Sequence, residues 1–147
     1  MTLHLIKLCV GVDTVQELKD WQTERLKELK RARKPVELFH RTLQTPKRRD
    51  EVLDGGSLYW VIKGFILVRQ RILDLRPAHK DDGTPCCAIV YDEEMIATRP
   101  QARRAFQGWR YLSAADVPAD LRVVEDDEGE MPQAMRADLR ELCLIDF

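Results

Sequence analysis

The sequence predicts one α+β domain in which a mixed, strongly curved sheet or small barrel is flanked by an N-terminal and a C-terminal helix. Three patterns support this fold class: short apolar runs typical of strands through the middle of the chain, and helical spacing of apolar residues after Thr14 and after Pro132. With 147 residues, 44% of them hydrophobic, the chain can bury a core without metal or disulfide. We therefore interpret residues 1–147 as a single domain.

The first two elements are predicted by a change in hydrophobic period. Residues 3–10 are apolar on both faces except at Lys7, which indicates a strand in the middle of a sheet. Thr14 and Glu17 have the spacing of a capping box, and helical periodicity then predicts a helix over residues 14–33. The chain is thus expected to begin with a strand and a long helix.

The middle of the chain is predicted to consist mainly of strands. Thr45 before Pro46 indicates the start of a short helix that ends at Gly55-Gly56, and Lys63-Gly64 indicates the turn of a hairpin. The predicted strands cover residues 36–43, 57–63, 65–75, 86–91, 95–98 and 106–112.

One strand of this series carries charge on its apolar face. Within residues 65–75, alternation places four apolar side chains on the same face as Arg69 and Arg71. The four are Phe65, Leu67, Leu73 and Leu75. An unpaired buried guanidinium is costly, so both arginines are expected to lie where the core ends or where an anion binds.

The last part of the chain is predicted to be helical and acidic. Ser113 and Asp116 have capping spacing and predict a short helix over residues 114–121. Residues 122–131 read as an acidic loop, and Pro132 opens a final helix whose apolar face carries Met135.

The charged residues divide the chain into a basic and an acidic part. Residues 1–110 contain 21 of the 24 Lys and Arg but 15 of the 25 Asp and Glu, so they carry a net charge of +6. Residues 111–147 carry −7. Such asymmetry indicates either a nucleic-acid surface or an acidic tail. The acidic loop itself has two interpretations: a solvated connection, or a nucleic-acid mimic that covers the basic face.

Several classes of protein are disfavoured by the composition. The apolar start of the chain is interrupted by His4 and Lys7, and no run approaches the length of a membrane span, so a cytoplasmic protein without a membrane partner is expected. The four cysteines, including the adjacent Cys86 and Cys87, lack metal-ligand spacing. We predict reduced thiols, no metal and no cofactor.

Basic residues interleaved with aromatic residues form the candidate ligand site. Phosphate groups need cations, and an unstacked base needs a flat ring on which to stack. The candidate site residues are His40, Arg41, Lys47, Arg48, Arg49, Trp60, Lys63, Arg104, Trp109, Arg110 and Tyr111. The competing interpretation is that Trp60 and Trp109 belong to the core and the arginines form a solvated rim.

No catalytic signature accompanies this cluster, so no catalytic residue is assigned. The favoured function is a noncatalytic RNA- or nucleotide-binding module. One alternative is an enzyme that acts on a nucleotide-like substrate in the same cleft, which requires a carboxylate or histidine in the pocket. The other is a protein-interaction module that binds a protein partner through the C-terminal helix and the acidic region, with the aromatic residues buried.

Three segments carry a family resemblance: HRTLQTPKRRDEVLDGGSLYWVIKG, VRQRILD and RRAFQGWRYL. They resemble an uncharacterised family of short alphaproteobacterial proteins known as domain of unknown function 1489, over nearly the whole chain. That family implies no established activity. The order of elements is also similar to the PUA-like superfamily, which includes the ASCH and EVE domains. This second resemblance implies a small β-barrel that binds RNA or modified bases.

Overall fold

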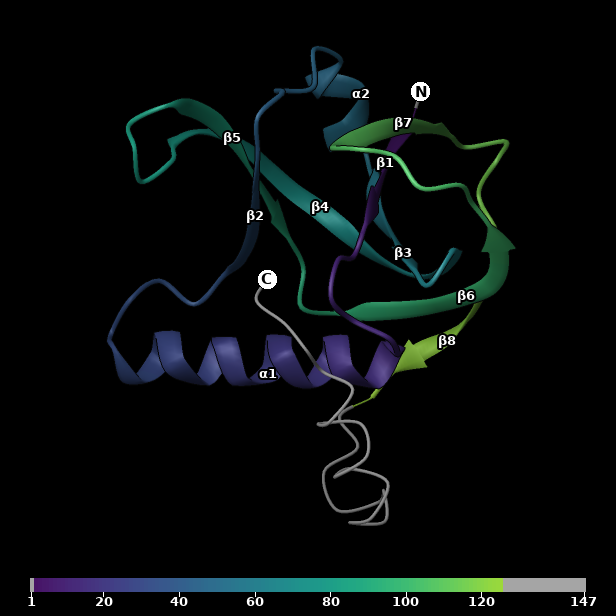
Figure 1. Ribbon diagram of the computed structural model, residues 1–147, viewed down its shortest axis with the longest axis horizontal. Helices are drawn as coiled ribbons and strands as arrows, with labels where there is room; N and C mark the ends of the chain where they lie inside the picture. Colours follow the sequence, from purple (N-terminus) through teal and green to yellow (C-terminus); the bar gives the residue numbers. More distant parts are fainter. Residues whose placement is uncertain (1, 126–147) are drawn as a thin grey trace.

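The computed structural model describes residues 2–125 and shows a mixed α and β fold (Figure 1). Within these residues eight strands form one sheet, and two helices accompany it. The elements are β1 (Leu3–Leu8), α1 (Val15–Arg31), β2 (Leu38–Thr42), α2 (Arg49–Leu53), β3 (Ser57–Ile62), β4 (Phe65–His79), β5 (Pro85–Tyr91), β6 (Met95–Ala102), β7 (Trp109–Ser113) and β8 (Asp120–Val124).

The sheet is mixed, as predicted. Its hydrogen-bonded order is β2-β5-β4-β3-β1-β7, while β6 pairs with β4 and β8. The β1–β3 pair is parallel, whereas the other pairs are antiparallel. Because the path ends at β2 and β7, which do not pair with each other in the described part of the chain, the sheet is open. The closed small barrel that the sequence suggested is not found.

Helix α1 begins where the capping box predicted. The Thr14 hydroxyl accepts a hydrogen bond from the Glu17 amide at 3.1 Å, and the Glu17 carboxylate accepts one from the Asp13 amide at 3.1 Å. The first contact satisfies one of the backbone donors that every helix start leaves free, and the second pairs the amide of the residue before the N-cap. The helix runs below the sheet in Figure 1 and buries Leu18 and Gln22 against it.

The β3–β4 hairpin also follows the prediction. Lys63 and Gly64 both have positive φ, 50° and 84°, which is the backbone of a two-residue hairpin turn that twists in the same sense as its strands. Strand β4 then continues through Pro77 to His79, beyond its predicted end. Pro77 is tolerated because this part of β4 pairs with β5 on one side, so the missing N–H breaks no second ladder.

The buried face of β4 differs from the prediction. Ile66, Val68, Gln70 and Ile72 are buried, whereas Phe65 and Leu73 are 45% and 52% exposed. A bulge opposite β5 between Ile72 and Asp74 then shifts the register, so that Leu75 points back into the core. Simple alternation along the strand therefore selected the wrong face for its first half.

Two helix predictions are corrected. Thr45 does not cap α2, which starts at Arg49 after Arg48 without a side-chain cap. The helix over residues 114–121 is wrong: the chain turns after Ser113, and Asp120–Val124 pairs with β6 as strand β8. The edge of β6 offers backbone hydrogen-bond partners to this segment. A capping pattern depends only on residues a few positions apart, so it cannot indicate such a partner. The expected C-terminal helix and residues 126–131 of the acidic loop lie outside the described residues.

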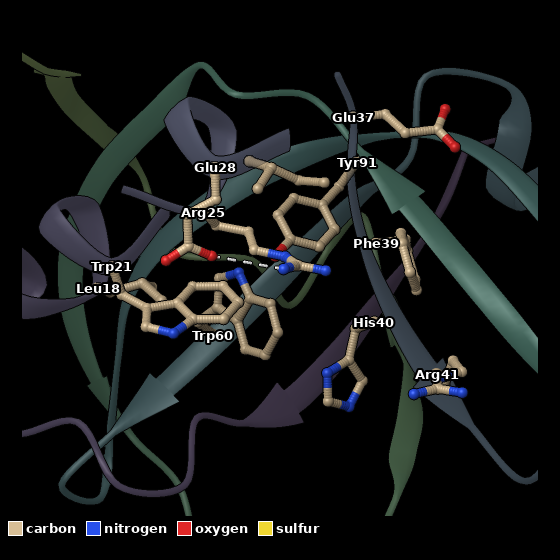
Figure 2. A pocket seen from close by; sticks show the side chains of 11 residues that line it. Leu18, Trp21, Arg25, Glu28, Glu37, Phe39, His40, Arg41, Trp60 and Tyr91 are labelled. Carbon is tan, nitrogen blue, oxygen red and sulfur yellow. Dashed lines mark ion pairs between the residues drawn. The ribbon is translucent and has the colours of Figure 1, made fainter. Parts of the chain in front are cut away.

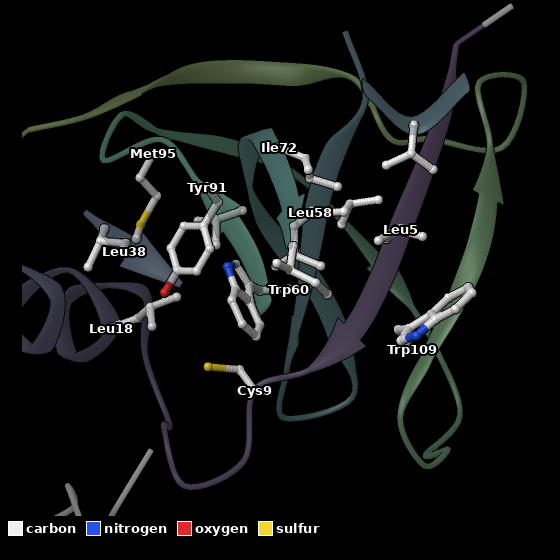
Figure 3. Packing of buried hydrophobic residues seen from close by; sticks show 14 of the residues in the cluster. Leu5, Cys9, Leu18, Leu38, Leu58, Trp60, Ile72, Tyr91, Met95 and Trp109 are labelled. Carbon is white, nitrogen blue, oxygen red and sulfur yellow. The ribbon is translucent and has the colours of Figure 1, made fainter. Parts of the chain in front are cut away.

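The core occupies both faces of the sheet. The larger cluster joins the sheet to α1 and includes Trp60, Tyr91 and Leu18 (Figure 3). A smaller cluster on the other face surrounds Tyr59 and Ile66. Among the described residues, no helix is long and apolar enough to cross a membrane.

Candidate functional site

A cavity of about 510 Å³ lies between α1 and β2, and four of its lining residues also belong to the larger core cluster (Figure 2). Helix α1 contributes one wall, strand β2 the other, and residues of β3 and β5 lie between them. The lining residues are Leu18, Trp21, Arg25, Glu28, Glu37, Leu38, Phe39, His40, Arg41, Trp60 and Tyr91. The cavity thus combines aromatic rings with charged groups.

The charged groups of the cavity are held by ion pairs. Arg25 lies 3.6 Å from the Glu28 carboxylate one helical turn later, and Glu37 accepts a hydrogen bond from Arg76 at 2.6 Å. Arg41 also lines the cavity, and its guanidinium lies 3.6 Å from the Asp81 carboxylate. Since the Arg25 side chain is 43% exposed, its guanidinium can exchange Glu28 for a ligand at little cost.

His40 supplies a neutral imidazole to the cavity. Alternation along β2 turns His40 inward between the exposed Phe39 and Arg41. Its ring lies edge-on to the indole of Trp60, with 5.9 Å between the ring centres. Burial, and then the positive charge of Lys7, lower the pKa of His40 from 6.5 to about 4. At neutral pH the imidazole therefore offers one hydrogen-bond donor and one acceptor.

A buried amide network holds the floor of the cavity. Gln22 and Gln70 exchange two hydrogen bonds of 2.9 and 2.7 Å, and the indole N–H of Trp60 donates to Gln70 at 3.0 Å. Gln70 also donates to the Asp92 carbonyl at 3.0 Å. A hydrogen bond joins the Tyr91 and Gln22 side chains, and burial raises the pKa of the Tyr91 phenol. The network fixes the aromatic rings that a ligand would meet.

The predicted site residues do not form one surface. His40, Arg41 and Trp60 lie at the cavity, whereas the basic cluster of residues 47–49 lies at α2, on the opposite side of the fold from α1 in Figure 1. Arg48 pairs with Glu51. Arg49 contacts Asp74 at 3.0 Å.

The remaining predicted cations are also distributed. Lys63 lies 3.5 Å from Asp13, and the Arg110 guanidinium lies 5.5 Å from the Phe106 ring centre. Lys47 and Arg104 are exposed. These residues, like residues 48 and 49, therefore lie at separate places on the surface of the fold and form a solvated rim.

Both predicted tryptophan platforms are core residues. Trp60 is 2% exposed and Trp109 is 8% exposed. The indole N–H of Trp109 donates to the Gln44 carbonyl at 2.7 Å. Tyr111 is 36% exposed and packs edge-on against Trp109, with 4.8 Å between ring centres. The interpretation that places these indoles in the core is therefore correct for both Trp60 and Trp109.

The residues of the site that the sequence prediction missed include Trp21, Arg25 and Tyr91. Trp21 and Arg25 are four residues apart, so they share one face of α1.

The described residues contain no group of three His, Cys, Asp or Glu side chains arranged to hold a metal ion. Cys9, Cys86 and Cys87 are free and buried. Burial raises the pKa of the Cys9 thiol to about 12, so this thiol is protonated at neutral pH.

The low pKa of His40 predicts a pH-dependent stability. The pKa of an unfolded histidine is near 6.5, whereas that of folded His40 is about 4, so folding favours the neutral ring. The contribution of this preference to the free energy of unfolding is complete above pH 6.5 and is lost as the pH falls towards 4. As the pH falls towards 4, we expect the wild type to lose about 1–3 kcal/mol more stability than the His40→Gln variant. Urea unfolding of both proteins at several pH values measures this difference. Equal pH dependence in the two proteins would contradict it.

Comparison with known proteins identifies the family of the chain. No curated protein and no solved structure matches it. The family model described as "Protein of unknown function (DUF1489)" matches residues 5–145, which is nearly the full length and includes every residue of the cavity. The chain belongs to the DUF1489 family of proteins of unknown function.

Proposed function

We propose that the protein is a noncatalytic module that binds a nucleotide, free or within RNA, in the cavity between α1 and β2. The observation that carries the proposal is the composition of this cavity, in which the aromatic residues Trp21 and Tyr91 accompany neutral His40 and the exposed Arg25.

The cavity suits a flat, polar ring better than an aliphatic ligand. Stacking of a base on an aromatic side chain contributes about 1–3 kcal/mol and tolerates every base. His40 offers a donor and an acceptor for the edge of the ring, and Arg25 offers further donors at the rim. A volume of about 510 Å³ falls within the range of small-molecule sites.

Titration with the four common ribonucleoside 5′-monophosphates tests the proposal. Isothermal calorimetry and tryptophan fluorescence are expected to show saturable binding of at least one of them. Arg25→Met and Trp21→Leu should each weaken that binding at least about tenfold, because one removes a charged hydrogen bond and the other a stacking surface.

Arg31→Met is the matched control for Arg25→Met. Arg31 is also in α1 and also pairs with a glutamate, Glu24 at 3.1 Å, but it lies outside the cavity. It is expected to bind like the wild type. The proposal fails if none of the four nucleotides binds at millimolar concentration, or if Arg25→Met and Trp21→Leu bind unchanged while remaining folded.

A further inference from the structure

Two arginines line the cavity, one from each of its two walls. Arg25 belongs to helix α1, whereas Arg41 belongs to strand β2 (Figure 2). The Arg25 side chain is 43% exposed and the Arg41 side chain is 42% exposed. A ligand that fills the cavity therefore meets a guanidinium group on each wall.

The ion pairs of these two arginines are long. Arg25 lies 3.6 Å from the Glu28 carboxylate, and Arg41 lies 3.6 Å from the Asp81 carboxylate. Outside the cavity, Arg69 forms two hydrogen bonds of 2.8 and 2.7 Å with a single carboxylate. Since a charge-assisted hydrogen bond is about 2.7–2.9 Å long, the pairs at 3.6 Å leave guanidinium donors available to a ligand.

The carboxylates near the cavity can give way to an anion. The side chains of Glu28 and Asp81 are 53% and 100% exposed, so water can replace the arginine as their partner at little cost. Glu37 also lines the cavity, but it is already paired with Arg76 at 2.6 Å. An anion that binds either cavity arginine therefore displaces an exposed carboxylate into solvent.

A second hollow adjoins the cavity at Arg41. It has a volume of about 390 Å³ and is lined by Arg41, Lys80, Asp81 and Asp82. The Arg41 guanidinium donates a hydrogen bond to the His79 carbonyl at 3.2 Å, which holds the side chain at this junction. A ligand that extends from the cavity into the second hollow therefore passes Arg41.

This arrangement suits a nucleotide with a phosphate on each side of its sugar. Its base would lie between the walls, where Trp21, His40 and Tyr91 line the cavity. Within a nucleic-acid strand each sugar carries one phosphate at its 5′ position and another at its 3′ position, whereas a free mononucleotide carries only one. Two separate guanidinium groups match the strand, because each can bind one phosphate bidentately.

We propose that the cavity binds an internal nucleotide of a single nucleic-acid strand, with Arg25 on one of its phosphates and Arg41 on the other. This inference rests on the nucleotide-binding function proposed above. It adds the class of ligand: a strand that continues past Arg41 into the second hollow, rather than a free mononucleotide.

The test compares the four common ribonucleoside 3′,5′-bisphosphates with the 5′- and 3′-monophosphates of the same nucleosides by isothermal calorimetry. For the base that binds best, the wild type is expected to bind the bisphosphate at least about tenfold more tightly than the better monophosphate, because the second phosphate gains its own arginine. In Arg41→Met this ratio should fall to about one. Arg41→Lys, which keeps the charge, should bind the bisphosphate more tightly than Arg41→Met does.

Arg31→Met again serves as the matched control. Arg31 is an arginine of α1 that lies outside the cavity, and its side chain is 68% exposed. This variant should keep the wild-type ratio between bisphosphate and monophosphate. Urea unfolding of each variant verifies that a lost ratio does not reflect a lost fold.

Single-stranded trinucleotides of RNA and of DNA with the same central base test whether the cavity accepts a strand. At least one of them should bind as tightly as the bisphosphate, and the tighter one identifies the sugar of the strand. Arg41→Met should weaken that binding at least about tenfold. If the bisphosphate binds but neither trinucleotide does, the assignment to a strand is wrong.

The outcomes separate this inference from the proposed function. If a monophosphate binds but the bisphosphate binds no more tightly, the inference fails and the proposed function stands. The same holds if the bisphosphate keeps its advantage in folded Arg41→Met. If neither monophosphates nor bisphosphates bind at millimolar concentration, the proposed function itself fails.

Discussion

Replacing Trp60 with alanine is expected to lower the free energy of unfolding by about 3–5 kcal/mol, the range for removing a large aromatic side chain from a core. Trp60 is 2% exposed and belongs to the larger core cluster. Its indole N–H donates to buried Gln70 at 3.0 Å, so the substitution also leaves a polar group without one of its partners. Urea denaturation monitored by circular dichroism measures the change.

Phe65→Ala is the matched control, because Phe65 is an aromatic residue of the same hairpin but is 45% exposed. Its loss is expected to cost much less, since most of its surface already contacts water. A change below about 1 kcal/mol for Trp60→Ala would contradict the assignment of Trp60 to the core. It would restore the alternative in which this indole serves as a ligand platform.

The second large effect is expected at Gln70. This side chain is fully buried and accepts from Trp60, exchanges two hydrogen bonds with Gln22 and donates to the Asp92 carbonyl. Gln70→Met preserves the approximate volume but leaves several buried polar groups unpaired, at about 1–3 kcal/mol each. We expect a loss of about 3–5 kcal/mol in the free energy of unfolding.

A double-mutant cycle distinguishes this mechanism from a simple packing defect. Gln22→Met together with Gln70→Met removes both amides, so the double variant should be more stable than the sum of the single losses predicts, by about 0.5–3 kcal/mol. Gln107→Met, at an exposed glutamine, should leave stability nearly unchanged. Strictly additive losses at Gln22 and Gln70 would show that the two amides do not act as a pair.

These two predictions bear on the site because the same network lies beneath the cavity. Trp60 and Tyr91 line the cavity. Trp60 is hydrogen-bonded to Gln70, and Tyr91 is hydrogen-bonded to Gln22. A ligand would therefore meet rings whose orientation is fixed before binding, which reduces the entropy lost on association.

Local sequence determined several elements of the fold. The Thr14 and Glu17 side chains satisfy backbone donors within their own turn, and Lys63-Gly64 adopts its turn with strands that are adjacent in the chain. The residue types at those positions specify the backbone through contacts a few residues away. The sequence likewise determined family membership, which the match over residues 5–145 confirms.

Tertiary structure decided the elements whose partners are distant in sequence. Ser113 and Asp116 carry a helix-start pattern, yet the following segment pairs with β6 as β8, because an unpaired strand edge offers hydrogen bonds that a single helical turn cannot match. The buried face of β4 was set in the same way, by pairing with β3 and β6 and by the bulge opposite β5.

The candidate site shows the same division. The sequence by itself indicated that His40 lies on a strand and that Lys7 interrupts an apolar one, because both patterns depend only on residues close together in the chain. Only the tertiary structure decided that α1 brings Trp21 and Arg25 to the cavity that His40 lines, and that Trp109 is buried. The physical reason is that proximity between strands depends on sheet order and curvature, which arise from pairings between residues far apart in the chain.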